Sequence, residues 1–140
     1  MRFFVNLNVL SALYAFILFL AVEILLNIGR LSRLTGWEMD AAAIGGMGLF
    51  IFACIAFTLL FYQLIKRLME NRKASFWSVL LWVPYFLLFI FAFVSLFPIT
   101  NPADEPADAT GLIIIFMVCF YPVYLLVLHV FGTGVGITDD

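Results

Sequence analysis

Glu23 is the side chain in this sequence best placed to do chemistry, because it lies inside a long apolar run. A charged side chain in the middle of a membrane-spanning helix costs about 2.5–3.5 kcal/mol on insertion scales, so a carboxyl group there indicates a specific task. Asn27 and Arg30 follow within two helical turns and, with Glu23, could form a polar cleft for an ion or a proton. In the alternative interpretation Glu23 is a hydrogen-bonded tie between helices, protonated or paired with Arg30 or Arg33.

Polar and small residues continue along one face of the same run. At helical spacing this face comprises Asn8, Ser11, Ala15, Phe19 and Glu23, with Arg30 on the same line. A stripe of this kind on an otherwise apolar helix is predicted to face protein and not lipid. We therefore expect Ser11, Ala15 and Glu23 to pack against other helices.

Three tyrosines lie at similar depth in the last two apolar runs, beside two prolines. Pro84 precedes Tyr85, and Pro122 lies between Tyr121 and Tyr124. Each proline removes a backbone hydrogen bond and is predicted to bend its helix near the middle of the membrane. The tyrosine hydroxyls could satisfy the carbonyl groups that the bends release, or they could line a polar cavity or a lipid-binding groove.

The second apolar run carries a pattern of small residues. Ala41, Gly45, Gly48 and Ala56 project on one face, and the pairs Ala41/Gly45 and Ala42/Gly46 both have small-xxx-small spacing. This spacing lets the backbones of two helices approach closely in lipid. The face is predicted to contact another helix, either within the chain or in a second copy.

Standard catalytic and metal-binding constellations are missing from the sequence. His129 is the one histidine, and its predicted position is on the opposite side of the bilayer from Glu23, so these two cannot pair. Cys54 and Cys119 lie deep within apolar runs, where a cysteine behaves as a small apolar residue. We expect no enzyme activity, no metal and no cofactor.

Four helices must position these residues, because four apolar runs fill most of the 140 residues: 7–28, 42–64, 76–97 and 111–130. Each is near the roughly 20 residues that a helix needs to cross a bilayer. The composition agrees, with 66% apolar and 11% charged residues. The predicted fold is all-α, a single transmembrane domain of four helices in an antiparallel bundle, with the first run kept as a span and not removed as a signal peptide.

The basic residues predict the orientation of the four spans. Lys66, Arg67, Arg72 and Lys73 crowd the second loop, and positive loops stay on the cytoplasmic side. Both termini are then cytoplasmic, and the same cluster could attract anionic lipids of the inner leaflet. A net charge of −2 argues against nucleic acid as a partner.

Two polar segments complete the prediction. The third loop, 98–110, contains three prolines and three acidic residues, and we expect it to be extended, solvated and not helical. The glycine-rich tail, 132–140, has too little apolar bulk to fold alone and is expected to be mobile.

These expectations favour a small integral membrane protein of a bacterial inner or plasma membrane. The first functional hypothesis is a non-enzymatic helix-bundle subunit that associates with itself or with other membrane proteins. The second is a small transporter, or an ion- or proton-conducting oligomer, that uses the carboxyl group of Glu23.

Overall fold

The computed structural model describes residues 2–68 and 73–133, and no strand occurs in this part of the chain. The elements are α1 (Arg2–Leu26), α2 (Ile28–Thr35), α3 (Met39–Leu68), the 3-10 helix η1 (Lys73–Trp77), α4 (Ser78–Leu96), the 3-10 helix η2 (Pro102–Asp104) and α5 (Asp108–Thr133). Four of the helices, α1, α3, α4 and α5, are long and apolar enough to span a membrane. The all-α class and the four apolar helices are therefore confirmed.

A short helix that the sequence analysis treated as loop follows α1. The predicted first span continues to residue 28, but α1 ends at Leu26, and Asn27 has φ −107° and ψ 16° where the chain bends. α2 then continues to Thr35 and stops at Gly36, whose φ of 72° is a left-handed conformation that favours glycine. Leu31 and Leu34 alternate with polar residues, so α2 is amphipathic and suits a membrane surface.

The other predicted spans are close to the observed helices. α3 and α5 extend beyond the predicted runs because polar residues such as Asp40 and Lys66 continue the helix past its apolar part. α4 begins at Ser78, two residues later than predicted, because η1 occupies the start of the run. The predictions for Arg72 and for residues 134–140 of the tail lie outside the described residues.

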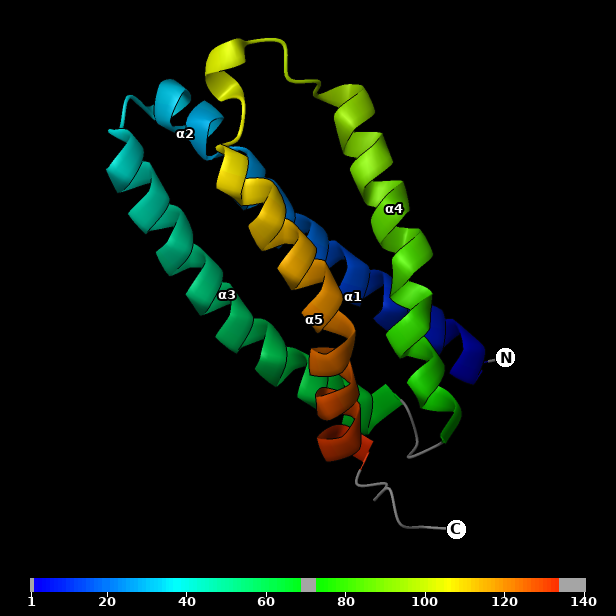
Figure 1. Cartoon of the computed structure of the whole chain (residues 1–140). Helices are drawn as coiled ribbons and strands as arrows, with labels where there is room; N and C mark the ends of the chain where they lie inside the picture. Colours follow the sequence, from blue (N-terminus) through cyan, green and yellow to red (C-terminus); the bar gives the residue numbers. More distant parts are fainter. Residues whose placement is uncertain (1, 69–72, 134–140) are drawn as a thin grey trace.

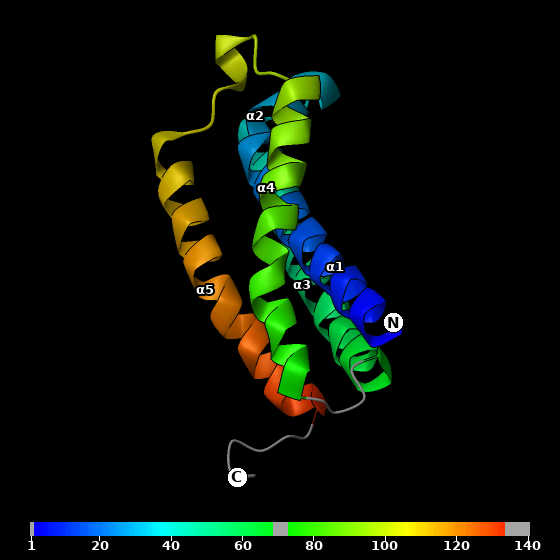
Figure 2. The ribbon, with the colours of Figure 1, turned by 90° about the vertical axis from the view of Figure 1, so that its right-hand side faces the viewer.

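α1 is the central helix of the bundle. It packs most extensively against α4 and also contacts α3 and α5, and Figures 1 and 2 show it among the three. Half of its most apolar stretch is buried (50%), against only 11% for α3. The core consists of buried side chains that include Leu10, Tyr14, Leu18, Val22, Phe61, Ile65, Trp82, Phe86 and Leu125. Most of the surface of α3 is therefore left without a partner in this chain.

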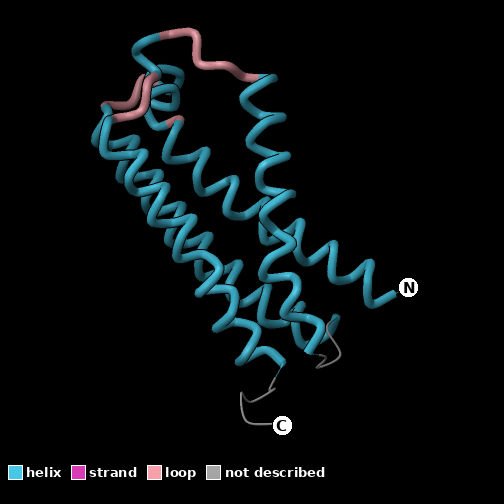
Figure 3. Tube along the Cα trace, turned by 45° about the vertical axis from the view of Figure 1, so that its right-hand side comes forward, coloured by secondary structure: helices cyan, strands magenta, loops and turns pink. Residues whose placement is uncertain are grey.

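The loop between α4 and α5 differs from its prediction. It does not stay extended, because Pro102–Asp104 forms η2, with the Asn101 side chain accepting a hydrogen bond from the Ala103 amide at 3.0 Å. η2 folds back over α2, and Asp104 is only 3% exposed. Figure 3 shows these loops gathered at one end of the bundle, which we call the α2 end.

Candidate functional site

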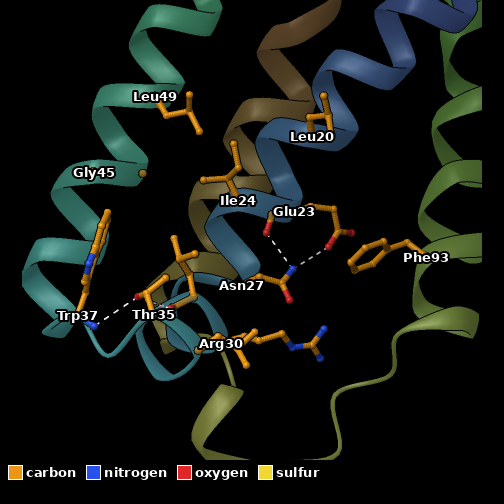
Figure 4. A pocket seen from close by; sticks show the side chains of 13 residues that line it. Leu20, Glu23, Ile24, Asn27, Arg30, Thr35, Trp37, Gly45, Leu49 and Phe93 are labelled. Atoms are coloured by element: carbon orange, nitrogen blue, oxygen red, sulfur yellow. Dashed lines mark hydrogen bonds between the residues drawn. The ribbon is translucent and has the colours of Figure 1, made fainter.

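Glu23 lies on the last turn of α1 and is almost fully buried, with 9% of its surface exposed. Its carboxylate atom Oε2 accepts a hydrogen bond from Nδ2 of Asn27 at 2.8 Å, and the same nitrogen donates to the Glu23 carbonyl oxygen at 2.9 Å (Figure 4). Both bonds stay within one turn of the chain. Asn27 thus holds the Glu23 side chain at the point where α1 ends.

The sequence left open whether Glu23 is protonated or paired with Arg30 or Arg33, and no such ion pair forms, because both arginines face Asp104. Arg33 binds this carboxylate with two hydrogen bonds, from Nε at 2.9 Å and from Nη2 at 2.7 Å. Arg30 is more loosely held, with Nε 3.7 Å from Asp104 and Nη2 donating to the Pro98 carbonyl oxygen at 3.3 Å. The fold of η2 over α2 brings this carboxylate closer than Glu23, which no sequence spacing could show.

The Arg33–Asp104 pair also changes the acidity of both groups. The hydrogen bonds from the Arg33 guanidinium hold the pKa of the Asp104 carboxyl below its usual value. The same hydrogen bonds raise the pKa of Arg33 above its usual value. The pair therefore stays charged at neutral pH and ties α2 to η2.

A cavity of about 640 Å³ opens beside Glu23 at the α2 end. Its walls come from α1, α2 and α3, with one residue from α4, as Figure 4 shows. Most of the lining is apolar, and we call this cavity the Glu23 cleft: Leu20, Glu23, Ile24, Asn27, Arg30, Leu31, Leu34, Thr35, Trp37, Gly45, Gly46, Leu49 and Phe93. Of the residues singled out in the sequence, the cleft brings together Glu23, Asn27, Arg30 and Gly45.

The three tyrosines are not part of the Glu23 cleft. Tyr85 donates to Oδ1 of Asn8 at 2.8 Å, and Tyr121 donates to the carbonyl oxygen of Tyr14 at 2.7 Å. Both bonds join a later helix to α1. The tyrosines therefore tie helices together, and neither of these bonds goes to a carbonyl group released by a proline.

Tyr124 makes a third interhelical bond, in which its hydroxyl lies 2.7 Å from Oγ1 of Thr58 on α3. Tyr121 and Tyr124 also line a smaller cavity of about 220 Å³ between α1, α3 and α5. The other lining residues are apolar side chains and Cys54. The cavity is therefore apolar, and it is not the polar cavity that was one of the alternatives from the sequence.

His129 forms a polar cluster that the sequence analysis missed. Its Nε2 lies 3.0 Å from the hydroxyl of Tyr14 and 2.8 Å from Oγ of Ser78, so α1, α4 and α5 meet there. All three residues are fully buried, and within the described residues Nδ1 of His129 has no hydrogen-bond partner. A histidine beside a serine hydroxyl can act as a general base, but complete burial keeps substrate away. We call Tyr14, Ser78 and His129 the His129 cluster, and its hydrogen bonds hold α1, α4 and α5 together.

The small residues of α3 divide between two faces. Ala42 and Gly46 are buried, and a Cβ on Gly46 would lie 3.5 Å from Ile24 of α1. The face that the sequence analysis preferred, with Ala41, Gly45, Gly48 and Ala56, is exposed along its whole length. Packing within the chain therefore uses the other small-xxx-small pair. By contrast, Ser11 and Ala15 of α1 are fully buried, as expected for a stripe that faces protein.

The described members of the basic cluster lie at the end of the bundle opposite to the α2 end. Lys66 and Arg67 are exposed in the last turn of α3, and Nζ of Lys66 lies 4.4 Å above the ring of Tyr62. Lys73 begins η1 directly beyond the gap in the described residues.

The chain matches no family model, no curated protein and no solved structure.

Proposed function

We propose that this chain is a non-enzymatic helix-bundle subunit of a membrane, and that α3 packs against a second copy or against a helix of another membrane protein. The observation that carries the proposal is the exposure of Ala41, Gly45, Gly48 and Ala56 on a single face of α3. This helix has the least buried apolar stretch of the four. It is thus the helix with the most surface available to a partner.

Small residues on a lipid-facing surface favour contact with another helix. A lipid chain next to a glycine gains no additional packing energy from the missing side chain. A second helix can instead approach closely and make van der Waals contacts along both backbones. Phe52, which is 71% exposed, lies on the same face one turn beyond Gly48. A partner helix would lie along the small residues and pack against the Phe52 ring.

We further propose the orientation in which the α2 end faces outward and both termini are cytoplasmic, as in a bacterial inner or plasma membrane. Lys66 and Arg67 at the opposite end support this orientation, because basic residues next to a span stay in the cytoplasm. α2 would then lie along the outer surface of the bilayer.

The test of the α3 face is energy transfer between labelled copies in liposomes, at increasing lipid dilution. Gly48→Leu is the sharpest variant, because a Cβ at residue 48 meets nothing within 4 Å in this chain and the fold should tolerate it. We expect self-association to weaken about tenfold, equivalent to about 1.4 kcal/mol. The matched control is Gly111→Leu on α5, which is equally unobstructed and should change nothing.

Two results would count against the proposal. If the wild type shows no transfer, a second copy is not the partner. If, in addition, crosslinking in native membranes recovers the same partners from Gly48→Leu as from the wild type, then the face has no docking role.

A second candidate function is transport of a cation or proton through an oligomer. The observation that favours it is the position of Glu23, a carboxyl group that lines a cavity open to the side of the bundle. Flux into proteoliposomes by the wild type, lost in Glu23→Gln, would support transport. Absence of flux from both proteins would leave the subunit role.

A further inference from the structure

We propose that the Glu23 cleft binds an amphiphilic cation, a molecule with an ammonium head and a long apolar tail. This binding does not require transport, and Gly45 is the one residue that the cleft shares with the docking face of α3. The ammonium group would lie against the carboxylate of Glu23, and the tail would follow the apolar wall of the cleft.

No ion pair joins Glu23 to a basic side chain among the described residues, and Arg30 interacts with its charge only at longer range. The two ion pairs found there both involve Asp104, and the one side chain that bonds the Glu23 carboxylate is the neutral amide of Asn27. Asn27 bonds to Oε2, which leaves Oε1 free to accept from a ligand. A carboxylate that is nearly buried in an apolar cleft gains most from a ligand that brings the opposite charge with it.

Arg30 does not supply that charge, although it also lines the cleft. Its guanidinium reaches toward the loop after α4, where it contacts Asp104 and the carbonyl oxygen of Pro98. At the level of Glu23 itself the lining is apolar except for Asn27. An ammonium group placed there meets the carboxylate of Glu23, while the guanidinium of Arg30 is engaged by Asp104 and the Pro98 carbonyl oxygen.

Aromatic and aliphatic side chains complete a site for this class of ligand. Figure 4 shows the Glu23 carboxylate directed toward the ring of Phe93, so a head group beside Glu23 would also face an aromatic ring. Ammonium groups are attracted to the faces of such rings. Leu20, Ile24 and Leu49 provide an apolar wall for the tail, and the volume of about 640 Å³ falls within the usual range for small-molecule sites.

Other occupants fit the cleft less well. An uncharged lipid tail would desolvate the carboxylate without compensating its charge. An anionic head group would be repelled by the carboxylate of Glu23.

The experiment compares three probes with the same tail on the intact protein in zwitterionic lipid nanodiscs. Radiolabelled dodecylamine, dodecanol and dodecyl phosphate are bound at pH 7, and uptake by empty nanodiscs is subtracted. Dodecylamine is protonated at this pH, as a lysine side chain is. We expect the wild type to bind the amine about tenfold more tightly than the alcohol, and the phosphate more weakly than either.

The variants locate the site. Glu23→Gln should lower amine affinity about tenfold and leave dodecanol unchanged, whereas the control Asp40→Asn, which removes an exposed carboxylate outside the cleft, should leave both unchanged. Phe93→Leu keeps the wall apolar and should weaken only the amine, by severalfold.

Equal binding of amine and alcohol by the wild type would overturn the proposal without any variant. Preference for the phosphate, lost in Arg30→Gln, would instead identify a site for anionic lipid and would also overturn it. If Glu23→Gln does not fold, the comparison of probes on the wild type and on Phe93→Leu still decides.

Discussion

At the scale of single residues, two buried polar groups stabilise the helix packing in different ways. His129 joins three helices through Tyr14 and Ser78, whereas Glu23 bonds only to its own helical turn through Asn27. The first is a tertiary contact between distant parts of the chain. The second is a local contact that leaves the carboxylate facing a cavity.

The His129 cluster predicts an order of destabilisation. Tyr14→Phe removes one hydrogen bond and keeps the ring, and should lower the free energy of unfolding by about 0.6 kcal/mol, a typical value in membrane proteins. His129→Ala removes both bonds at Nε2 and leaves a cavity, and should cost about 2–3 kcal/mol. Unfolding with sodium dodecyl sulfate in mixed micelles measures both. Equal losses would show that the imidazole contributes nothing beyond the tyrosine bond.

Glu23 predicts a contrast between two substitutions. Glu23→Gln keeps an oxygen that can accept from Asn27, so the melting temperature in detergent should change little, by less than the equivalent of about 1 kcal/mol. Glu23→Lys places an unpaired cation in an apolar cleft that Arg30 also lines and should be clearly less stable. A loss for Gln as large as that for Lys would mean that the fold itself requires an ionised carboxylate.

At the scale of elements, α2 and η2 form one unit at the α2 end. Arg33 binds Asp104 through two hydrogen bonds, and a Cβ on Gly29 would lie only 3.2 Å from the Ala103 carbonyl oxygen. The two short helices therefore make a side-chain contact at Arg33 and Asp104, and their backbones approach closely at Gly29 and Ala103. This contact closes one end of the bundle without adding to its apolar core.

The Asp104 contact predicts a dependence of stability on pH. Because Arg33 lowers the pKa of Asp104 in the folded chain, the stabilisation is complete above the unfolded pKa, near 4, and is lost as the pH falls through the lower folded value. The wild type should thus lose stability below about pH 4 more steeply than Asp104→Asn, which has no carboxylate to titrate. Melting temperatures of both proteins between pH 7 and pH 3 would test this, and parallel curves would contradict it.

At the scale of the whole molecule, the four long helices are unequally buried. α1 lies in the middle, while α3 exposes a large apolar surface that includes Ile44, Met47, Phe52 and Ile55. Lipid can cover such a surface, and so can another helix. The proposed orientation decides which residues of this surface lie near each side of the membrane.

The orientation can be tested by labelling single cysteines in intact cells, in a background of Cys54→Ala and Cys119→Ala. Thr100→Cys lies in the exposed loop after α4, and Ala74→Cys is exposed on η1 at the opposite end. An impermeant maleimide should react with Thr100→Cys directly and with Ala74→Cys only after the membrane is opened. The reverse pattern would invert the proposed orientation.

The amino-acid sequence alone determined the class of the fold and the positions of the four long helices. Apolar runs of about twenty residues are read almost entirely from local composition, because in lipid the backbone must satisfy its own hydrogen bonds within each helix. The sequence also identified Glu23, Asn27 and Arg30 as neighbours, since residues three and four apart lie on one face of a helix. The amphipathic α2 was not predicted, although the spacing of Ile28, Leu31 and Leu34 before Gly36 is typical of a short helix.

Only the tertiary structure decided which distant residues meet. The pairing of Arg33 with Asp104, 71 positions apart, and of Tyr14 with His129, 115 positions apart, depends on how helices rotate and tilt against one another. The same rotation turned Gly46 toward α1 and left Gly45 and Gly48 exposed. The rotation of each helix is set by the combined packing of many side chains. Because lipid is as apolar as the core, hydrophobicity along the sequence does not distinguish a buried face of a helix from a lipid-facing one.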